Sequence, residues 1–496
     1  MKTFLRVIAL MCLLVGMLFV LPQGDISAAT TTSTFTHTRV TTDSYDDYYP
    51  QVSGDYVVWQ GDTYYEDPSS SISRTADLQY EIYLYQISTG VTTRLTDNTN
   101  DEYSPMIDGD NVVWRGNGDG DYEIYHYAIS TGVTTKVTNN SANDSFPQID
   151  GDHIVWNIDT GGDYEVYLYT ISTGITTPVT ANTGDDYDPR IDGDHIVWYG
   201  DSDGDEEVYL YTISTGVTTK VSDNTINDES PRISGNYVSW GQYEDGQPED
   251  AMLYNISTGV TTEITFTSAT DPYYLRIAMD GDYVALSAGD DGYQEIYLHQ
   301  ISTATTTRIT DDAPMDVDPE IDGNFLVWEK SDEIFLYEID QDSTSQLSTF
   351  TGFVNNYRPQ VEGSYVTWYG STGGGNPKEI LLVGINIPTA PELISPADGT
   401  STAVDTSPTF EWNAVTGAVS YTFEYSQDDT FATSTTATTS NTTYAPGELA
   451  VGTWYWRVNA SNGTTVGEWS ETWSVTIFDP IGTPSPRFPT NNWEIT

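Results

Sequence analysis

Short runs of alternating apolar and polar residues, separated by clusters of Asp, Gly, Ser and Thr, recur along most of this chain. In one clear stretch the runs are Gln148–Ile149, His153–Trp156, Glu165–Thr170 and Thr176–Thr180. A two-residue period in runs this short is typical of β-strands. The Asp-Gly and Ser-Thr-Gly groups between the runs favour tight turns. The pattern predicts an all-β fold built from units of four short antiparallel strands.

These four-strand units repeat at a fixed period. Successive copies begin 42 residues apart, at Pro105, Pro147, Pro189 and Pro231. Fainter copies begin at Pro50, Leu275, Pro319 and Pro359. A period of about 40 residues with four strands per unit is typical of a β-propeller. We expect eight blades, with seven as the alternative if one weak copy is irregular.

The two ends of the repeat region predict how the propeller closes. The last copy supplies three strands and stops near Ile385, whereas the segment Thr36–Thr41 is similar to the fourth strand of the other copies. Pairing of these two segments would join the ends of the ring and leave no exposed sheet edge. We therefore expect an N-terminal strand to complete the last blade.

The repeats resemble the PD40, or TolB-like, family of propellers over residues 35–386. The residues that carry the resemblance are Asp192-Gly193-Asp194, Ile196-Val197-Trp198, Asp203-Gly204, Glu207-Val208-Tyr209 and Val221-Ser222. The resemblance implies a WD40-like propeller. It leaves the function open, because such propellers serve as binding scaffolds, as accessory domains of enzymes and as lyases. The low Lys and Arg content departs from the pattern of the family.

The repeat stops near residue 387, and a different pattern of strands follows. Tyr421–Tyr425, Gly452–Ala460 and Trp469–Ile477 alternate with a period of two, as half-buried strands do. The segment resembles fibronectin type III modules, with Trp412 and Tyr455–Arg457 in the places of core aromatics. We expect a β-sandwich. The predicted domains are a signal peptide (1–29), the propeller (30–386), the sandwich (387–478) and a Pro-rich tail or linker (479–496).

The N-terminal segment predicts export. Lys2 and Arg6 precede the apolar run Val7–Leu21, and Ser27–Ala29 fits a signal-peptidase site. The run is short for a membrane-spanning helix, so an uncleaved anchor is the weaker alternative. The mature chain would have no cysteine, because Cys12 is the only one. We expect a secreted or cell-surface protein with no membrane span after cleavage.

The charge balance excludes several kinds of partner. The chain carries 17 Lys and Arg against 74 Asp and Glu, a formal net charge of −57. Binding to nucleic acid or to an anionic membrane surface requires clustered basic residues. We therefore expect no nucleic-acid partner, and a monomer that meets a protein or carbohydrate partner at the cell surface.

Acidic residues gather in loops that the order of the strands places on one face. The best local candidate for a calcium site is Asp201, Asp203 and Asp205, because alternating carboxylates can converge on one ion. Asp119 and Asp121 form a similar group. The alternative is an Asp-Gly turn on an acidic, solubilising surface. No cofactor other than calcium is predicted.

In six of the copies an acidic residue lies three positions before the starting proline. This position predicts a ring at the mouth of the propeller channel, where it would bind a partner. Like charges at this density repel one another, and hard cations would relieve the repulsion. The members of the set are Asp47, Glu102, Asp144, Asp186, Asp228 and Asp316.

The first copy contains an insertion, Thr63–Gln79, that the repeat does not require. Its Tyr64, Tyr65 and Arg74 are candidates for partner binding, because a long loop on a rigid scaffold often carries specificity. A disordered excursion is the alternative. The tryptophans that recur on the second strand of each copy are expected to pack between blades instead.

The chain shows no nucleophile elbow, zinc-protease motif or phosphate-binding loop. The interpretation we favour is non-catalytic binding or adhesion through the acidic face, with no catalytic residue assigned. One alternative is a carbohydrate-active enzyme of the polysaccharide lyase type, or its accessory subunit. The other is a structural spacer within a larger surface protein.

Overall fold

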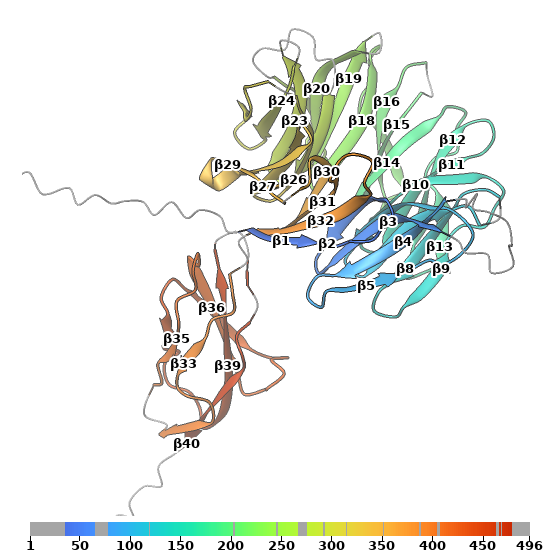
Figure 1. Ribbon diagram of the computed structural model, residues 1–496. Helices are drawn as coiled ribbons and strands as arrows, with labels where there is room; N and C mark the ends of the chain where they lie inside the picture. Colours follow the sequence, from blue (N-terminus) through green and yellow to red (C-terminus); the bar gives the residue numbers. More distant parts are fainter. Residues whose placement is uncertain are drawn as a thin grey trace, which may run out of the picture. The chain divides into compact units, whose positions relative to one another are not determined.

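The structure of the 496-residue chain is a computed structural model (Figure 1). The described chain consists of strands, turns and one short 3-10 turn, η1 (Ile339–Gln341), so the all-β prediction is confirmed. None of its helices is long and apolar enough to span a membrane. The structure describes residues 35–64, 78–118, 120–201, 204–244, 247–265, 275–290, 293–313, 315–350, 352–385, 388–403, 407–462, 466–467 and 469–478. The predicted signal peptide lies outside these described residues.

Eight four-stranded antiparallel sheets occupy the described residues from Phe35 to Ile385. The strands of each sheet are given below in the order in which they pair. The first four are β2 (Asp47–Ser53), β3 (Tyr56–Tyr64), β4 (Leu78–Gln86), β5 (Val91–Arg94); β6 (Glu102–Asp108), β7 (Asn111–Gly116), β8 (Glu123–Ala128), β9 (Val133–Lys136); β10 (Asn143–Asp150), β11 (His153–Asp159), β12 (Tyr164–Thr170), β13 (Ile175–Pro178); and β14 (Asp186–Asp192), β15 (His195–Gly200), β16 (Glu207–Thr212), β17 (Val217–Lys220).

The other four sheets follow in the same order along the chain, and the last of them takes its fourth strand from the N-terminus. They are β18 (Asn227–Ser234), β19 (Tyr237–Glu244), β20 (Gln247–Asn255), β21 (Val260–Ile264); β22 (Leu275–Asp280), β23 (Tyr283–Asp290), β24 (Tyr293–Gln300), β25 (Thr305–Arg308); β26 (Asp316–Asp322), β27 (Phe325–Lys330), β28 (Glu333–Glu338), β29 (Ser343–Gln346); and β30 (Asn355–Glu362), β31 (Tyr365–Ser371), β32 (Lys378–Ile385), β1 (Phe35–Arg39).

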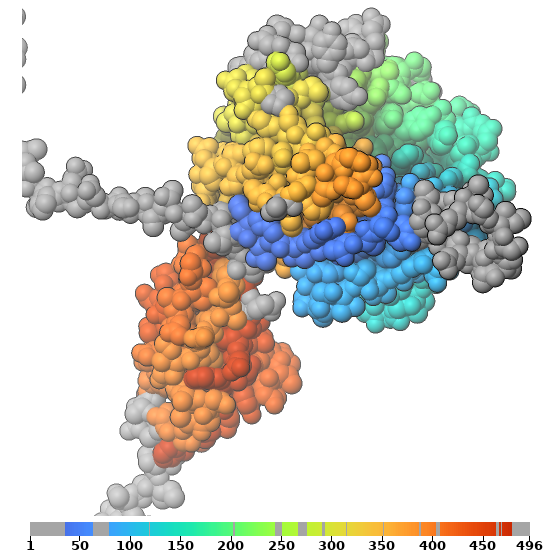
Figure 2. Space-filling model, in the orientation of Figure 1, coloured from blue at the N-terminus to red at the C-terminus, as the bar shows by residue number. Residues whose placement is uncertain are grey.

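The sheets form a closed ring, which makes this part of the chain a β-propeller. The first strand of each sheet contacts the first strand of the next, from β2 through β6, β10, β14, β18, β22 and β26 to β30, and β30 contacts β2. Strand β1 pairs with β32 in antiparallel register, with Phe35 opposite Ile385 and Arg39 opposite Leu381. The prediction that an N-terminal strand completes the last sheet is confirmed. In Figure 2 the blue N-terminal segment lies directly against the orange surface of that sheet.

Large aromatic side chains fill the space between neighbouring sheets. The second-strand tryptophans are at most 2% exposed and pack on apolar residues of the sheet before them, as Trp114 does on Val58 and Ile82. Most of them also stack on an aromatic ring of the third strand, as Trp198 does on Tyr209 with centroids 5.6 Å apart. The prediction that these tryptophans form the core is confirmed. Those at most 2% exposed are Trp59, Trp114, Trp156, Trp198, Trp240, Trp328 and Trp368.

The Asp-Gly turn between the first two strands of a sheet fastens that sheet to its neighbour. Asp108 of one sheet accepts a hydrogen bond from the amide of Gly151 in the next, at 2.6 Å. A side chain at the same position makes the same bond from sheet to sheet, and Ser53 donates to Glu362 at 3.0 Å where the ring closes. The acceptors are Ser53, Asp108, Asp150, Asp192, Ser234, Asp280 and Asp322.

The C-terminal residues form two further sheets, described here by themselves. One has three strands and the other five, and both contribute side chains to one hydrophobic core around Phe410, Phe423 and Trp456. Trp412 and Trp456 are buried in it, as predicted for core aromatics. The strands are β33 (Leu393–Ser395), β35 (Phe410–Trp412) and β38 (Thr443–Tyr444), then β34 (Thr400–Ala403), β40 (Trp473–Phe478), β39 (Gly452–Ser461), β36 (Ser420–Ser426) and β37 (Thr435–Thr439).

Candidate functional site

The acidic residues predicted to ring an open channel mouth are buried instead. Their exposed fractions are only 0–4%. Each accepts a hydrogen bond of 2.6–2.8 Å from the indole N–H of the tryptophan 12 residues later. They are therefore structural acceptors between the first and second strands of their own sheets, and the prediction of an acidic ring at the channel mouth is wrong for these described residues. The residues concerned are Asp47, Glu102, Asp144, Asp186, Asp228 and Asp316.

The cause is a β-bulge in the first strand. The register of β2 against β3 shifts between Tyr48 and Gln51, and the same shift occurs in six other sheets. The residue before the proline takes a left-handed backbone, as Tyr49 does at φ 52° and Phe146 at φ 55°. An extra residue in one strand changes the face to which the neighbouring side chains point. The bulge therefore turns these acids into the sheet interior, which their position before the proline did not predict.

Burial also changes how readily these carboxyl groups hold a proton. Desolvation, reinforced by Asp43, raises the pKa of Asp47 to about 8. Desolvation likewise raises the pKa of Glu102 to about 7, and those of Asp144 and Asp186 to about 6, although the hydrogen bonds from tryptophan oppose the rise. These groups accept indole N–H bonds as carboxylates, at an electrostatic cost that falls when they are protonated.

The predicted calcium loops are described only in part. Asp203 and Asp119 lie outside the described residues. The carboxylate of Asp201 accepts a hydrogen bond from the backbone N–H of Asp185 at 2.7 Å. This bond holds the carboxylate against the segment that precedes β14. Asp121 is half-buried. Asp205 is also half-buried, and a calcium site in either loop stays a prediction.

The predicted insertion loop is also largely outside the described residues. Tyr64 is the last residue of β3, and Tyr65 and Arg74 belong to the segment 65–77 that is not described. The role of these three residues in partner binding stays a prediction.

Three carboxylates form a group that could hold a metal ion. Oxygens of Glu295, Asp312 and Asp316 all lie within 4.8 Å of one another. The ammonium group of Lys330 already contacts Asp312 and lies 3.7 Å from Asp316 Oδ2, while Arg308 pairs with Glu295 at 3.0 Å. A metal ion here would compete with two cations of the protein itself.

The sequence did not reveal a continuous run of tyrosine rings across three adjacent sheets. Neighbouring rings in this run have centroids 5.1–6.2 Å apart. Most of the rings are half-buried, and Tyr49 is 41% exposed. We call this run the tyrosine arc. It consists of Tyr357 (β30), Tyr369 (β31), Tyr48 and Tyr49 (β2), Tyr80 (β4), Tyr103 (β6) and Tyr122, which directly precedes β8.

Basic side chains lie over the rings of the tyrosine arc. Arg358 lies 5.2 Å from the centroid of Tyr49, and Lys378 lies 4.2 Å from that of Tyr48. Arg115 lies over Tyr122 at 4.9 Å and also over Phe146 at 5.5 Å, and Phe146 is 56% exposed. A cation over an aromatic face is stabilised by the ring quadrupole. The surface thus combines flat apolar faces with fixed N–H donors.

Polar residues of the first strands meet around the axis of the ring. Arg190 donates to Gln148 at 3.0 Å and to Asp188 at 2.9 Å, and Arg232 lies 3.4 Å from Asp188. Burial and the nearby Arg232 lower the pKa of Arg190 to about 10. Burial raises the pKa of Glu320, and Arg232 opposes that rise. Opposite charges therefore balance one another in this axial layer.

All five histidines of the chain lie in its described part, and no histidine ring there contacts the tyrosine arc. His126 and His299 are buried, and desolvation lowers the pKa of both. His153 and His195 begin β11 and β15, next to the Asp-Gly turns. The described arc thus brings phenols and basic side chains together without an imidazole.

The sequence showed that tyrosine is abundant, but it did not show that these tyrosines lie side by side. The chain has 36 tyrosines, and most arc members lie outside the core positions that the repeat makes obvious. One signal was available: Tyr48, Tyr103 and Tyr187 each directly follow the buried acid, where the repeat does not require an aromatic residue. Tyr187 belongs to a second, shorter group with Tyr164 and Tyr199.

No family model and no curated protein sequence matches this chain. Several solved structures are similar to it. TolB from Acinetobacter baumannii is 18% identical with a TM-score of 0.33, and the match covers 46% of this chain and 59% of TolB. An oligogalacturonate lyase in complex with manganese is 13% identical with a TM-score of 0.44, covering 66% of this chain and 96% of the lyase.

A prolyl endopeptidase is 11% identical with a TM-score of 0.47, and the match covers 73% of this chain and 57% of the peptidase. Similarities at this level assign no activity to the chain. Its propeller fold rests on the closed ring of four-stranded sheets described above.

Proposed function

We propose that this chain is an exported, non-catalytic binding protein that holds a carbohydrate chain on the tyrosine arc. The observation that carries the proposal is the continuous row of rings over three adjacent sheets, with Tyr49 exposed at its centre. Aromatic faces pack against the apolar faces of sugar rings, and phenol and guanidinium groups donate hydrogen bonds to hydroxyls. An extended row of rings suits an extended chain of sugars.

The charges of the molecule favour a neutral carbohydrate. The formal net charge of −57 repels acidic polysaccharides at long range. The phenols of the arc are neutral, because desolvation and neighbouring carboxylates raise the pKa of Tyr80 and Tyr357 to about 12. Asp46 accepts from the hydroxyl of Tyr48 at 2.8 Å and provides an acceptor at the edge of the arc.

The architecture proposed around this surface is an eight-bladed propeller at 30–386, in which each four-stranded sheet is one blade. The two C-terminal sheets would be a fibronectin type III-like sandwich at 387–478, with residues 1–29 removed as a signal peptide on export. The closed ring and the shared core of the two C-terminal sheets support this division. We propose a monomer that works outside the cytoplasm, with calcium bound by its acidic loops.

The proposal predicts that neutral polysaccharides bind to the arc. We expect the double substitution Tyr49→Asn with Tyr103→Ala to weaken binding at least tenfold, which corresponds to about 1.4 kcal/mol. Asparagine is chosen at position 49 because it tolerates the left-handed backbone there. Affinity electrophoresis against a panel of neutral polysaccharides, followed by calorimetric titration of the best ligand, measures the effect.

Val133→Ala is the matched control, because Val133 is 55% exposed on β9, the outermost strand of its sheet. It should bind as the unsubstituted protein does. Equal binding by the double variant would place the site elsewhere. If no polysaccharide binds at all, a protein partner becomes the better interpretation of the arc.

A further inference from the structure

We call the segment that connects the fourth strand of one sheet to the first strand of the next a link. Four links share one side-chain hydrogen bond. An asparagine four residues before the buried acid donates its side-chain amide to that acid, at 2.5–2.8 Å. The amide thereby satisfies the oxygen that tryptophan does not reach, as Asn140 does for Asp144 Oδ2. The pairs are Asn98 with Glu102, Asn140 with Asp144, Asn182 with Asp186, and Asn224 with Asp228.

Two links carry aspartate in place of this asparagine, and the two differ in one respect. Asp312 precedes Asp316, and Lys330 contacts both carboxylates, as described above. Asp43 precedes Asp47 where β1 of the last sheet leads into β2 of the first, a link that we call the seam. The residue two positions after the tryptophan is Lys330 in the first case but Gly61 at the seam. The seam therefore lacks both the amide donor and the ammonium group.

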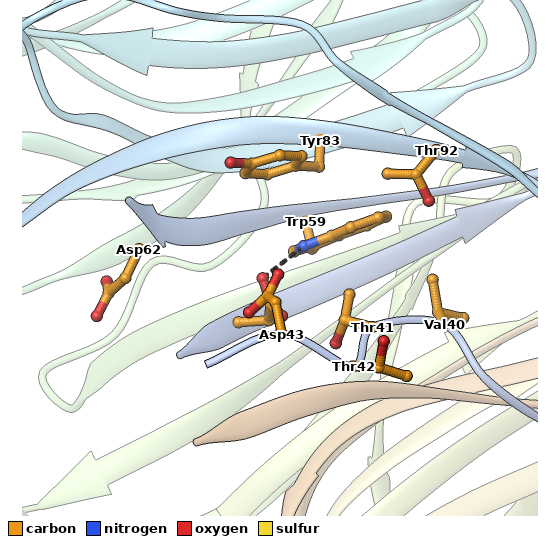
Figure 3. Close-up of a pocket in the computed structure, with 9 residues that line it drawn as sticks. Val40, Thr41, Thr42, Asp43, Trp59, Asp62, Tyr83 and Thr92 are labelled. Atoms are coloured by element: carbon orange, nitrogen blue, oxygen red, sulfur yellow. Dashed lines mark hydrogen bonds between the residues drawn. The ribbon is translucent and has the colours of Figure 1, made fainter. Parts of the chain in front are cut away.

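A cavity of about 220 Å³ lies at the seam, lined by residues of the seam and of the first sheet. Figure 3 shows Asp43, Thr41 and Thr42 around it, with Tyr83 and Trp59 opposite. Its lining residues are Val40, Thr41, Thr42, Asp43, Asp47, Trp59, Asp62, Tyr83 and Thr92.

Asp47 lines this cavity, and one of its two carboxylate oxygens has no hydrogen-bond partner. The residue is 3% exposed, and its Oδ1 accepts from Trp59 at 2.8 Å. Its Oδ2 is buried without a hydrogen-bond partner. The nearby hydroxyl of Thr41 donates to Glu379 at 3.0 Å, and its proximity to Asp47 opposes the rise of the pKa of that carboxyl group. A buried carboxylate oxygen without a donor is costly, and a positive group from outside the chain would relieve that cost.

We propose that the seam cavity binds one calcium ion between the carboxylates of Asp43 and Asp47. Calcium takes about six to eight oxygen ligands in irregular geometry, and accepts hydroxyls and water beside carboxylates. Thr42 is among the lining residues and could supply a hydroxyl, and a cavity of about 220 Å³ leaves room for water ligands. Magnesium fits less well, because it demands a near-ideal octahedron. The ion would fasten the two ends of the propeller ring.

The test uses Asp43→Asn, which gives the seam the asparagine of the four other links. We expect the unsubstituted protein to bind calcium with a saturable rise in melting temperature at constant ionic strength. The variant should bind one equivalent fewer in equilibrium dialysis and show a smaller rise in melting temperature. Without calcium, it should melt no lower than the unsubstituted protein, because the amide donates to Asp47. Asp43→Ser serves as a second variant that removes the carboxylate without adding an amide.

Asp312→Asn is the matched control, because Lys330 already neutralises that link. It should keep the calcium response and the stoichiometry of the unsubstituted protein. The proposal is overturned if the unsubstituted protein binds no calcium beyond what sodium chloride reproduces. It is equally overturned if Asp43→Asn and Asp43→Ser keep the full stoichiometry, which would place the ion in another acidic loop. Neither result bears on carbohydrate binding by the tyrosine arc.

Discussion

At the scale of single residues, each second-strand tryptophan and the acid 12 residues before it act as a pair. Where Leu286 replaces the tryptophan, the residue 12 positions earlier is Tyr274 and not an acid. In the last sheet Asn356 replaces the acid and still accepts from Trp368, at 2.9 Å. What the fold requires is therefore an acceptor for a buried indole N–H. The constant spacing was visible in the sequence, whereas the bulge that turns the acid inward was not.

Trp198→Phe should destabilise the propeller by about 1–3 kcal/mol beyond the effect of lost volume, because Asp186 Oδ1 loses its donor in a buried place. Trp412→Phe is the matched control in the C-terminal sheets, since Trp412 is equally buried but its Nε1 has no hydrogen-bond partner. Differential scanning calorimetry measures both variants. Equal losses in the two would mean that the indole bond contributes nothing beyond packing.

At the scale of elements, ring closure depends on a strand that is remote in sequence. Strand β1 covers the edge of β32, and Arg39 pairs with Glu379 at 2.6 Å. The same pairing of a fourth-strand cation with a third-strand glutamate occurs within other sheets, as between Arg94 and Glu81 at 2.8 Å. The sequence predicted this closure because the segment around Arg39 repeats the fourth-strand pattern. The cavity at the seam could not be predicted, because it depends on which side chains fill the link.

Removing β1 should open the ring. A chain that begins at Thr42 exposes the edge of β32, a ready template for pairing with another chain. We expect it to unfold at a lower temperature and to associate, whereas a chain that begins at Phe35 should match the full-length protein. Analytical ultracentrifugation and thermal melting of the two truncated chains test this. A monomeric, equally stable chain from Thr42 would show that β1 is dispensable.

At the scale of the whole molecule, the few basic residues have defined places in the described chain. Some pair with third-strand glutamates, as Lys136 does with Glu123 at 3.3 Å. Others lie on the tyrosine arc or in the axial layer, such as Arg115 and Arg190. The period and charge of the sequence predicted the ring and its acidic surface. They did not predict where the cations gather, because a repeat shows what its copies share and the arc is built from their differences.

The stability of the propeller should fall as the pH rises from about 4 to about 7. Glu102, Asp144 and Asp186 have folded-state pKa values of about 7, 6 and 6, all above their ordinary values. A raised pKa means that the folded state binds the proton more tightly. Its contribution is complete below the unfolded pKa and is lost as the pH rises through the folded pKa. Each group adds a slope of at most about 1.4 kcal/mol per pH unit in its window.

Exchanging two residues isolates this effect from the net charge. Asn182→Asp with Asp186→Asn moves the carboxylate from a buried position to an exposed one and reverses the hydrogen bond between them, while Trp198 keeps its acceptor. We expect the exchanged chain to be more stable than the unsubstituted protein at pH 8 and to lose less stability between pH 5 and pH 8. Melting temperatures in EDTA at fixed ionic strength measure both slopes. Parallel slopes would mean that the buried carboxyl of Asp186 titrates as an ordinary surface acid, and the pH dependence would then come from the diffuse repulsion of the acidic surface.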